Sequence, residues 1–207
     1  FMKPQAQKTS VQKLTFGAVL TALVILLQFM GTFIRFGPFS ISLVLLPIVI
    51  GAATCGPYMG AWLGFVFGLV VLISGDASAF LAVNIPGTII TVLLKGTACG
   101  LCAGLIYKLF SKLNRYVGVA AAAIVCPLVN TGVFLLGCWL FFYDTVAGWA
   151  VGMGYGENVA AYMFLVLVGG NFVVELLINT LLSPVIVRLL GIRSKKPSGP
   201  AAPNDAE

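Results

Sequence analysis

The chain has 207 residues, of which 60% are hydrophobic and 9% charged, and its mean hydropathy is +1.07. Soluble domains carry about 25% charged and roughly 45–50% apolar residues, so this composition excludes a soluble enzyme, a disordered regulator and a nucleic-acid-binding domain. The net charge of +6 is distributed in short basic clusters between long apolar runs, which is typical of membrane-flanking charges. One membrane span needs roughly 20 apolar residues, so the chain has room for about six.

Taken in chain order, the apolar runs predict six membrane-spanning helices, over residues 14–34, 41–54, 58–74, 86–109, 117–142 and 159–190. The break Cys55-Gly56-Pro57 predicts that the second and third spans form a hairpin. Pro86 suits the first turn of the fourth span. The longest loop is expected over residues 143–158. The predicted organisation is a cytoplasmic segment over 1–10, a membrane domain over 11–192 and a disordered Pro- and Ala-rich tail over 193–207.

The basic residues give the predicted orientation. Six spans place all three basic clusters on one side of the membrane; their members are Lys3, Lys8 and Lys13, then Lys108, Lys112 and Arg115, then Arg188, Arg193, Lys195 and Lys196. The positive-inside rule makes that side cytoplasmic. We therefore expect an all-α, multi-pass protein of the plasma membrane with both termini in the cytoplasm.

Glycines recur every four residues in the third and fourth spans, at Gly60, Gly64 and Gly68 and at Gly96, Gly100 and Gly104. Small residues at this spacing let two helix backbones approach closely in lipid, so we expect helix packing there, with a moving groove as the alternative.

Two ionisable residues lie deep in the predicted spans. Lys95 lies about 13 Å into the fourth span and Glu175 about 20 Å from the basic end of the sixth, at 1.5 Å per residue. Charges inside a membrane are costly and are therefore candidates for function. Lys95 and Glu175 can pair with each other or contact a ligand, and the sequence leaves both open.

Further polar residues lie near this pair. Asn171, Glu175 and Asn179 form one stripe on the sixth helix, and Asn130 and Thr131 lie midway along the fifth. Hydrogen bonds between helices would satisfy a single asparagine, but the whole set, with Trp139 and Tyr143 nearer the outer end, favours a small-molecule pocket.

Several catalytic signatures are absent from the sequence. It contains no Walker A motif, no histidine, no acidic metal cluster and no G-x-S-x-G, and its five cysteines lie in apolar runs as core residues. We therefore expect no enzyme activity, no cofactor and no metal. Uphill transport would need an ion gradient or separate subunits.

Three segments resemble the substrate-binding S components of energy-coupling factor (ECF) vitamin transporters. The first helix reads Phe16-Gly17-Ala18-Val19-Leu20-Thr21-Ala22, which is similar to the Ala-x-x-x-Ala signature of that family. The stretches 46–52 and 60–68, with Gly56-Pro57 between them, resemble its second and third helices. The resemblance covers residues 11–192.

The resemblance implies six helices and a substrate near the extracellular end, under loops at about 33–40, 74–85 and 143–158. It also implies docking through Ala18 and Ala22 onto a transmembrane coupling subunit that works with two cytoplasmic ATPases. Ala18 and Ala22 would leave a flat strip for a partner helix.

The candidate substrate-binding residues are chosen for their chemistry. Lys95 and Arg35 suit an anionic group, and Glu175 is a further candidate. Asparagine side chains would form hydrogen bonds with amide and hydroxyl groups of the substrate, at Asn84, Asn130 and Asn171. Its apolar part would contact Trp139, Tyr143 and Phe36. A small hydroxylated acid fits, with pantothenate the first candidate and riboflavin and folate next. The alternatives are a stand-alone ion-coupled transporter with Lys95 and Glu175 as a relay, and a membrane enzyme or structural subunit.

Overall fold

The computed structural model describes residues 4–32, 35–36, 39–40 and 43–194, with side chains over 11–32 and 43–188. Long helices make up most of the described chain. In order, the elements are α1 (Pro4–Gly31), β1 (Arg35–Phe36), β2 (Phe39–Ser40), α2 (Leu45–Cys55), α3 (Pro57–Ile73), α4 (Ser78–Leu81), α5 (Ile85–Phe110), α6 (Arg115–Phe141), α7 (Tyr143–Gly152), α8 (Val159–Tyr162), the π-helix η1 (Met163–Leu167) and α9 (Gly169–Ser194).

Local sequence signals fix several of the helix ends. Gly56 separates α2 from α3 with φ at 103°, a backbone conformation that favours glycine, and Pro57 then starts α3. At the start of α5, the side chain of Asn84 accepts a hydrogen bond from the Gly87 amide at 3.0 Å. Pro86 lies in the first turn, as predicted. The sequence therefore correctly predicts the break between α2 and α3 at Gly56 and the start of α5.

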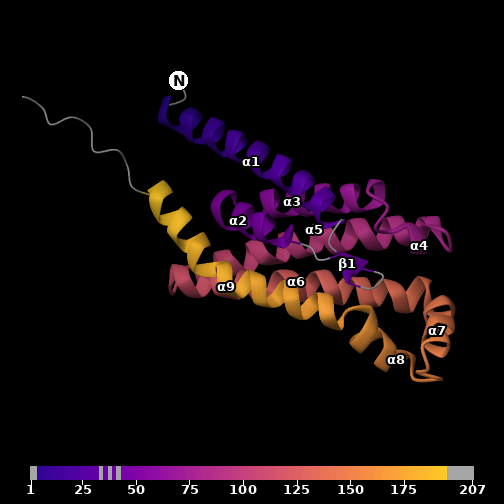
Figure 1. The fold of residues 1–207 in the computed structure, drawn as a ribbon. Coiled ribbons are helices and arrows are strands. Elements are labelled where there is room, and N and C mark those ends of the chain that lie inside the picture. Colours follow the sequence, from indigo (N-terminus) through magenta and orange to yellow (C-terminus); the bar gives the residue numbers. More distant parts are fainter. Residues whose placement is uncertain (1–3, 33–34, 37–38, 41–42, 195–207) are drawn as a thin grey trace, which may run out of the picture.

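The helices form one elongated bundle (Figure 1). The start of α1 and the end of α9 lie at the same end of this bundle, and α4, α7 and α8 lie at the other. Because α5 leads away from α4 and α6 leads back to α7, the basic connection between α5 and α6 lies at the end with the termini. The described members of the three basic clusters thus lie at one end: Lys8 and Lys13, then Lys108, Lys112 and Arg115, then Arg188 and Arg193.

The prediction of six membrane-spanning helices is confirmed in part: the described residues contain four helices long enough to span a membrane and two shorter apolar helices. Four described helices are long and apolar enough to cross a membrane: Val11–Gly31, Ile85–Phe110, Arg115–Phe141 and Gly169–Arg188. The second and third predicted spans correspond to α2 and α3, which have 11 and 17 residues. At 1.5 Å per residue α2 is only about 16 Å long, well short of the ~30 Å hydrocarbon layer.

Two connections and one predicted span contain structure that the sequence did not predict. The expected loop at 143–158 begins with the ten-residue helix α7. The expected sixth span is interrupted, since α8 and η1 precede α9 and Val168 separates the last two. The first loop contains a two-stranded antiparallel hairpin, with Arg35 opposite Ser40. The predicted tail over 193–207 falls mostly outside the described residues, and α9 continues to Ser194.

The glycine stripes form the tightest contact in the bundle, between α3 and α5. A Cβ added at Gly64 would overlap the carbonyl oxygen of Gly96, and one added at Gly60 would overlap that of Gly100. The two backbones are therefore in direct contact, and the predicted packing role of both stripes is confirmed.

Two clusters of buried apolar side chains form the core. One is shared by α1, α2, α3, α5, α6 and α9, and includes Leu45, Ile48 and Leu63. The other lies at the α7 end and includes Phe80, Val146 and Leu167. The buried polar side chains among the described residues are Gln28, Thr88, Thr91, Asn130, Glu175 and Asn179.

Candidate functional site

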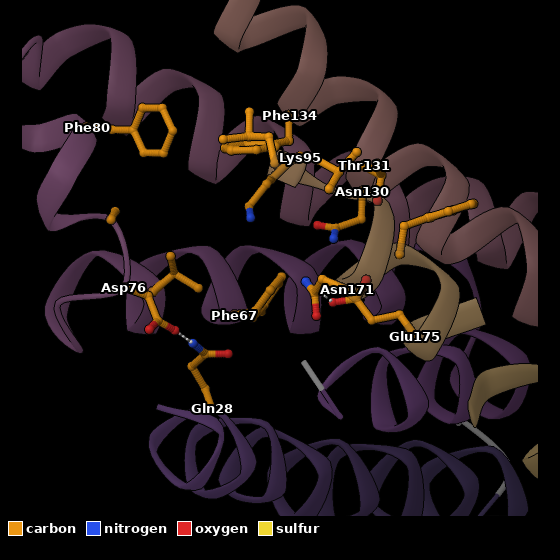
Figure 2. Close-up of a pocket in the computed structure, with 15 residues that line it drawn as sticks. Gln28, Phe67, Asp76, Phe80, Lys95, Asn130, Thr131, Phe134, Asn171 and Glu175 are labelled. Carbon is orange, nitrogen blue, oxygen red and sulfur yellow. Dashed lines mark hydrogen bonds between the residues drawn. The ribbon is translucent and has the colours of Figure 1, made fainter. Parts of the chain in front are cut away.

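A cavity lies where the two cores meet (Figure 2). Its lining residues come from α1, α3, α5, α6, η1 and α9 and from the segment that contains α4. The space open to the centre of a water molecule is about 80 Å³. The apolar walls include Phe67, Phe80, Phe134 and Phe172. The charged and amide side chains are Gln28, Asp76, Lys95, Asn130, Asn171 and Glu175.

Lys95 is the one cation among the described residues that line this cavity. It follows ten residues after the start of α5, about 15 Å along the helix, so it lies near the middle of the span. Its ammonium nitrogen is 5.1 Å from the centre of the Phe134 ring and 5.6 Å from that of Phe67. Aromatic faces attract a cation, which helps to hold Lys95 there. Figure 2 shows the ammonium group directed into the cavity.

Each of the two carboxylates in the cavity accepts a hydrogen bond from a neighbouring amide. Gln28 on α1 donates to Asp76 Oδ2 at 2.5 Å, and Asn171 donates to Glu175 Oε1 at 3.0 Å on the same helix. Glu175 is 1% exposed, so this hydrogen bond offsets part of the cost of burying its charge. Within the described part of the chain, the Lys95 ammonium group contacts the Phe67 and Phe134 rings.

Two amide oxygens in the cavity wall are buried without a hydrogen-bond partner among the described residues. They are Oδ1 of Asn130 and Oδ1 of Asn171. A buried polar atom without a partner costs about 1–3 kcal/mol, and native structures contain few of them. A bound molecule with hydroxyl or N–H groups would remove this cost.

Four of the residues selected from the sequence line this one cavity. They are Lys95, Asn130, Asn171 and Glu175, which come from three different helices. The polar stripe on α9 is divided by the fold, because Asn179 lies outside the cavity and donates to the backbone oxygen of Glu175 at 2.9 Å. The fold therefore brings together the centre of the predicted pocket.

The other selected residues lie elsewhere. Asn84 caps α5 and, with Tyr143, lines a separate open hollow at the α7 end. Trp139 is 61% exposed on α6, because it lies on the face directed away from the bundle. Arg35 and Phe36 form strand β1, but their side chains are outside the described part of the structure.

Sequence reasoning did not select Gln28, Asp76 or the four cavity phenylalanines. Gln28 is 1% exposed, and a glutamine inside an apolar run is a signal that could have identified it. The phenylalanines carried no such signal, since the chain has 15 of them. Within the described residues, no group of three or more His, Cys, Asp or Glu side chains could hold a metal ion.

The predicted docking residues lie on the outside of the bundle. Ala18 and Ala22 are exposed on α1, whereas Leu20 and Val24 face the core. The exposed indole of Trp62 on α3 donates a hydrogen bond to Thr21 Oγ1 at 3.3 Å. An exposed small-residue strip is therefore present on α1, beside α3.

Comparison with known protein families matches residues 12–190 to the ECF transporter, substrate-specific component. The chain belongs to this family. No curated protein and no solved structure matches it.

Family membership determines the general role of the chain. It is a multi-pass membrane protein that binds a substrate for transport, and it is not an enzyme. As a substrate-specific component, it works with a coupling subunit and ATPase subunits. Energy from ATP therefore enters through other chains, which is consistent with the absence of a Walker A motif from this sequence.

Proposed function

We propose that this chain captures a vitamin in the Lys95 cavity, with pantothenate the first candidate and riboflavin and folate next. The observation that carries the proposal is the ammonium group of Lys95, which is directed into a cavity lined by amides, rings and two carboxylates. Each carboxylate already accepts a hydrogen bond from an amide. An anionic group of the substrate would use the hydrogen-bond donors of Lys95. The walls formed by Phe67 and Phe134 would strengthen that contact by excluding water.

The remaining contacts in this proposal follow from the unpartnered oxygens. Oδ1 of Asn130 and Oδ1 of Asn171 would accept hydrogen bonds from hydroxyl or N–H groups of the substrate. A hydroxylated carboxylic acid such as pantothenate carries both kinds of group.

The proposal also includes the orientation in the membrane and the docking surface. We infer that both termini are cytoplasmic, so that α4 and α7 face the extracellular side and the substrate enters there. Ala18 and Ala22 would contact the coupling subunit, and two ATPases would drive release inward. This arrangement is supported by the common end of the basic clusters and by the exposure of both alanines.

The first experiment identifies small molecules released from the full chain purified in detergent, by mass spectrometry. Calorimetric titration with pantothenate, riboflavin and folate follows. We expect one of them to bind tightly without any ion gradient. A chain that binds none of the three would contradict the proposal.

A second experiment separates subunit from stand-alone carrier. Proteoliposomes containing the chain alone are given a proton gradient, and matched vesicles contain the chain with its coupling and ATPase subunits and ATP. We expect uptake only in the second set. Gradient-driven uptake by the chain alone would instead support an ion-coupled transporter that uses Lys95 and Glu175.

A further inference from the structure

A second, mainly apolar hollow adjoins the polar cavity. It lies between the α4 segment and α7 and has a volume of about 440 Å³. Its walls include Trp149, Met153 and Tyr162. Asp76, Phe80 and Leu167 line both spaces, so the cavity and the hollow meet at these three side chains.

The polar cavity alone is small for a vitamin. Pockets for small molecules usually measure about 300–1,000 Å³, whereas the polar cavity measures about 80 Å³. A vitamin held by Lys95 would therefore extend beyond the polar cavity. The adjoining hollow of about 440 Å³ provides the missing volume and a surface of different chemistry.

Phe80 is the largest side chain at the junction. It belongs to the four-residue helix α4 and is 6% exposed. Its ring packs edge to face against Phe134, at 5.5 Å between ring centres, and against Trp149, also at 5.5 Å. Phe80 therefore contacts a ring from each space. Figure 2 shows it at the end of the polar cavity away from Glu175.

We propose that the cavity and the hollow are one extended site divided by Phe80, and that the ligand is an elongated amphipathic acid that occupies both. Its anionic, hydrogen-bonding end lies at Lys95, Asn130 and Asn171. Its apolar end passes Phe80 and lies against Trp149 and Met153. Phe80 is thus a specificity-determining residue, because it sets the width of the passage between the ends. This inference rests on the proposed function, since it assumes that a vitamin binds at Lys95.

Two glycines of α7 allow the hollow to be filled without altering the polar cavity. Gly148 and Gly152 line the hollow only, and a Cβ added at either would meet no other atom within 4 Å. Gly148→Phe and Gly152→Phe would therefore place a ring in the hollow without a backbone clash. Gly132→Phe on α6 is the matched control, because Gly132 has equally open surroundings and lines neither space.

The test is calorimetric titration of the full chain and these variants with pantothenate, riboflavin and folate. For pantothenate or folate, whichever binds the wild-type chain, we expect at least tenfold weaker binding to Gly148→Phe or Gly152→Phe and unchanged binding to Gly132→Phe. Binding of riboflavin alone, which carries no carboxylate, would overturn the inference that the ligand is an acid. Wild-type affinity in both filled variants would overturn the two-part site and leave the proposed function standing. If the hollow holds only a co-purifying lipid, filling it would likewise leave vitamin affinity unchanged, and the two-part site would be overturned. Failure of the wild-type chain to bind any of the three would overturn the proposed function, and this inference with it.

Fluorescence provides a second, independent readout. The sequence has three tryptophans, so Trp62→Phe with Trp139→Phe leaves Trp149 as the reporter in the hollow. A ligand that occupies the hollow is expected to shift or quench Trp149 emission at the concentrations that saturate binding. Saturation by calorimetry with no change in emission would overturn the inference.

Discussion

Helix α5 has two faces with opposite chemistry, and their difference shows how this chain separates packing from binding. On one face Gly96 and Gly100 contact the backbone of α3, without space and without polar side chains. On the neighbouring face Lys95 is directed into a cavity with amides and rings. Helices in lipid gain stability by close packing, because lipid tails are as apolar as the side chains they would replace. The glycine face supplies this packing, and the polar face is available for a ligand.

The glycine face should be the less tolerant of substitution. In Gly64→Leu, the new Cβ would overlap the carbonyl oxygen of Gly96, which is backbone and cannot rotate away. Overpacking costs about 1–3 kcal/mol, and we expect the upper end of this range or more. The thermal unfolding midpoint in detergent should fall by roughly 5 °C or more.

Gly132→Leu on α6 is the control, because a Cβ there meets no atom within 4 Å. It should unfold within about 1 °C of the wild type, since a side chain that displaces no neighbouring atom leaves the packing unchanged. Equal midpoints for the two variants would show that the contact between α3 and α5 is not a determinant of stability.

The polar face should respond in binding rather than in folding. Lys95→Met keeps the length of the side chain and removes its charge, so we expect affinity for the bound vitamin to fall roughly 10- to 100-fold, since a charged hydrogen bond contributes about 1.5–3 kcal/mol. Titration calorimetry measures the loss. Lys108→Met, at the exposed last turn of α5, should bind as the wild type does. If Lys95→Met also binds normally, Lys95 has a structural role.

Much of the helical framework was predictable because its signals are local. Apolar runs, the Gly56-Pro57 break and Pro86 each determine structure within a few residues, and the structure agrees with them. Helix α7 was missed because its sequence mixes glycines and aromatics and is too short for a span. The interruption at η1 was missed because residues 159–190 are apolar on both sides of it.

The centre of the site was predictable for a different reason. Lys95, Asn130 and Glu175 are polar residues in spans, where polarity is rare and costly. The hydrogen bond between Gln28 and Asp76 joins residues 48 positions apart, and no spacing rule connects them. The direction of Trp139, and hence its exposure, likewise depends on which face of α6 packs inward.

Two asparagines allow a comparison between a buried amide that lines the cavity and a buried amide that does not. Both have an Oδ1 without a partner among the described residues, but Asn130 lines the cavity, whereas Asn179 is buried outside it and donates to the Glu175 backbone. Asn130→Leu should weaken vitamin binding about 2- to 10-fold, the value of one neutral hydrogen bond, and Asn179→Leu should leave affinity unchanged. Calorimetry on both variants decides this. Equal losses would mean that Asn179 on α9 supports binding as much as Asn130 on α6 does.

The smallest effect on the isolated chain is expected on its outer surface. Ala22 is exposed on α1, away from both faces of α5, so Ala22→Trp should leave vitamin affinity and the unfolding midpoint unchanged. The same substitution should abolish uptake in proteoliposomes that contain the coupling and ATPase subunits, because a large side chain would prevent a partner helix from approaching the strip. Leu181→Trp, at a position that is 73% exposed on α9, should retain uptake. Loss of vitamin binding in Ala22→Trp would show that this face of α1 supports the site itself, whereas full uptake would assign the docking surface to another helix.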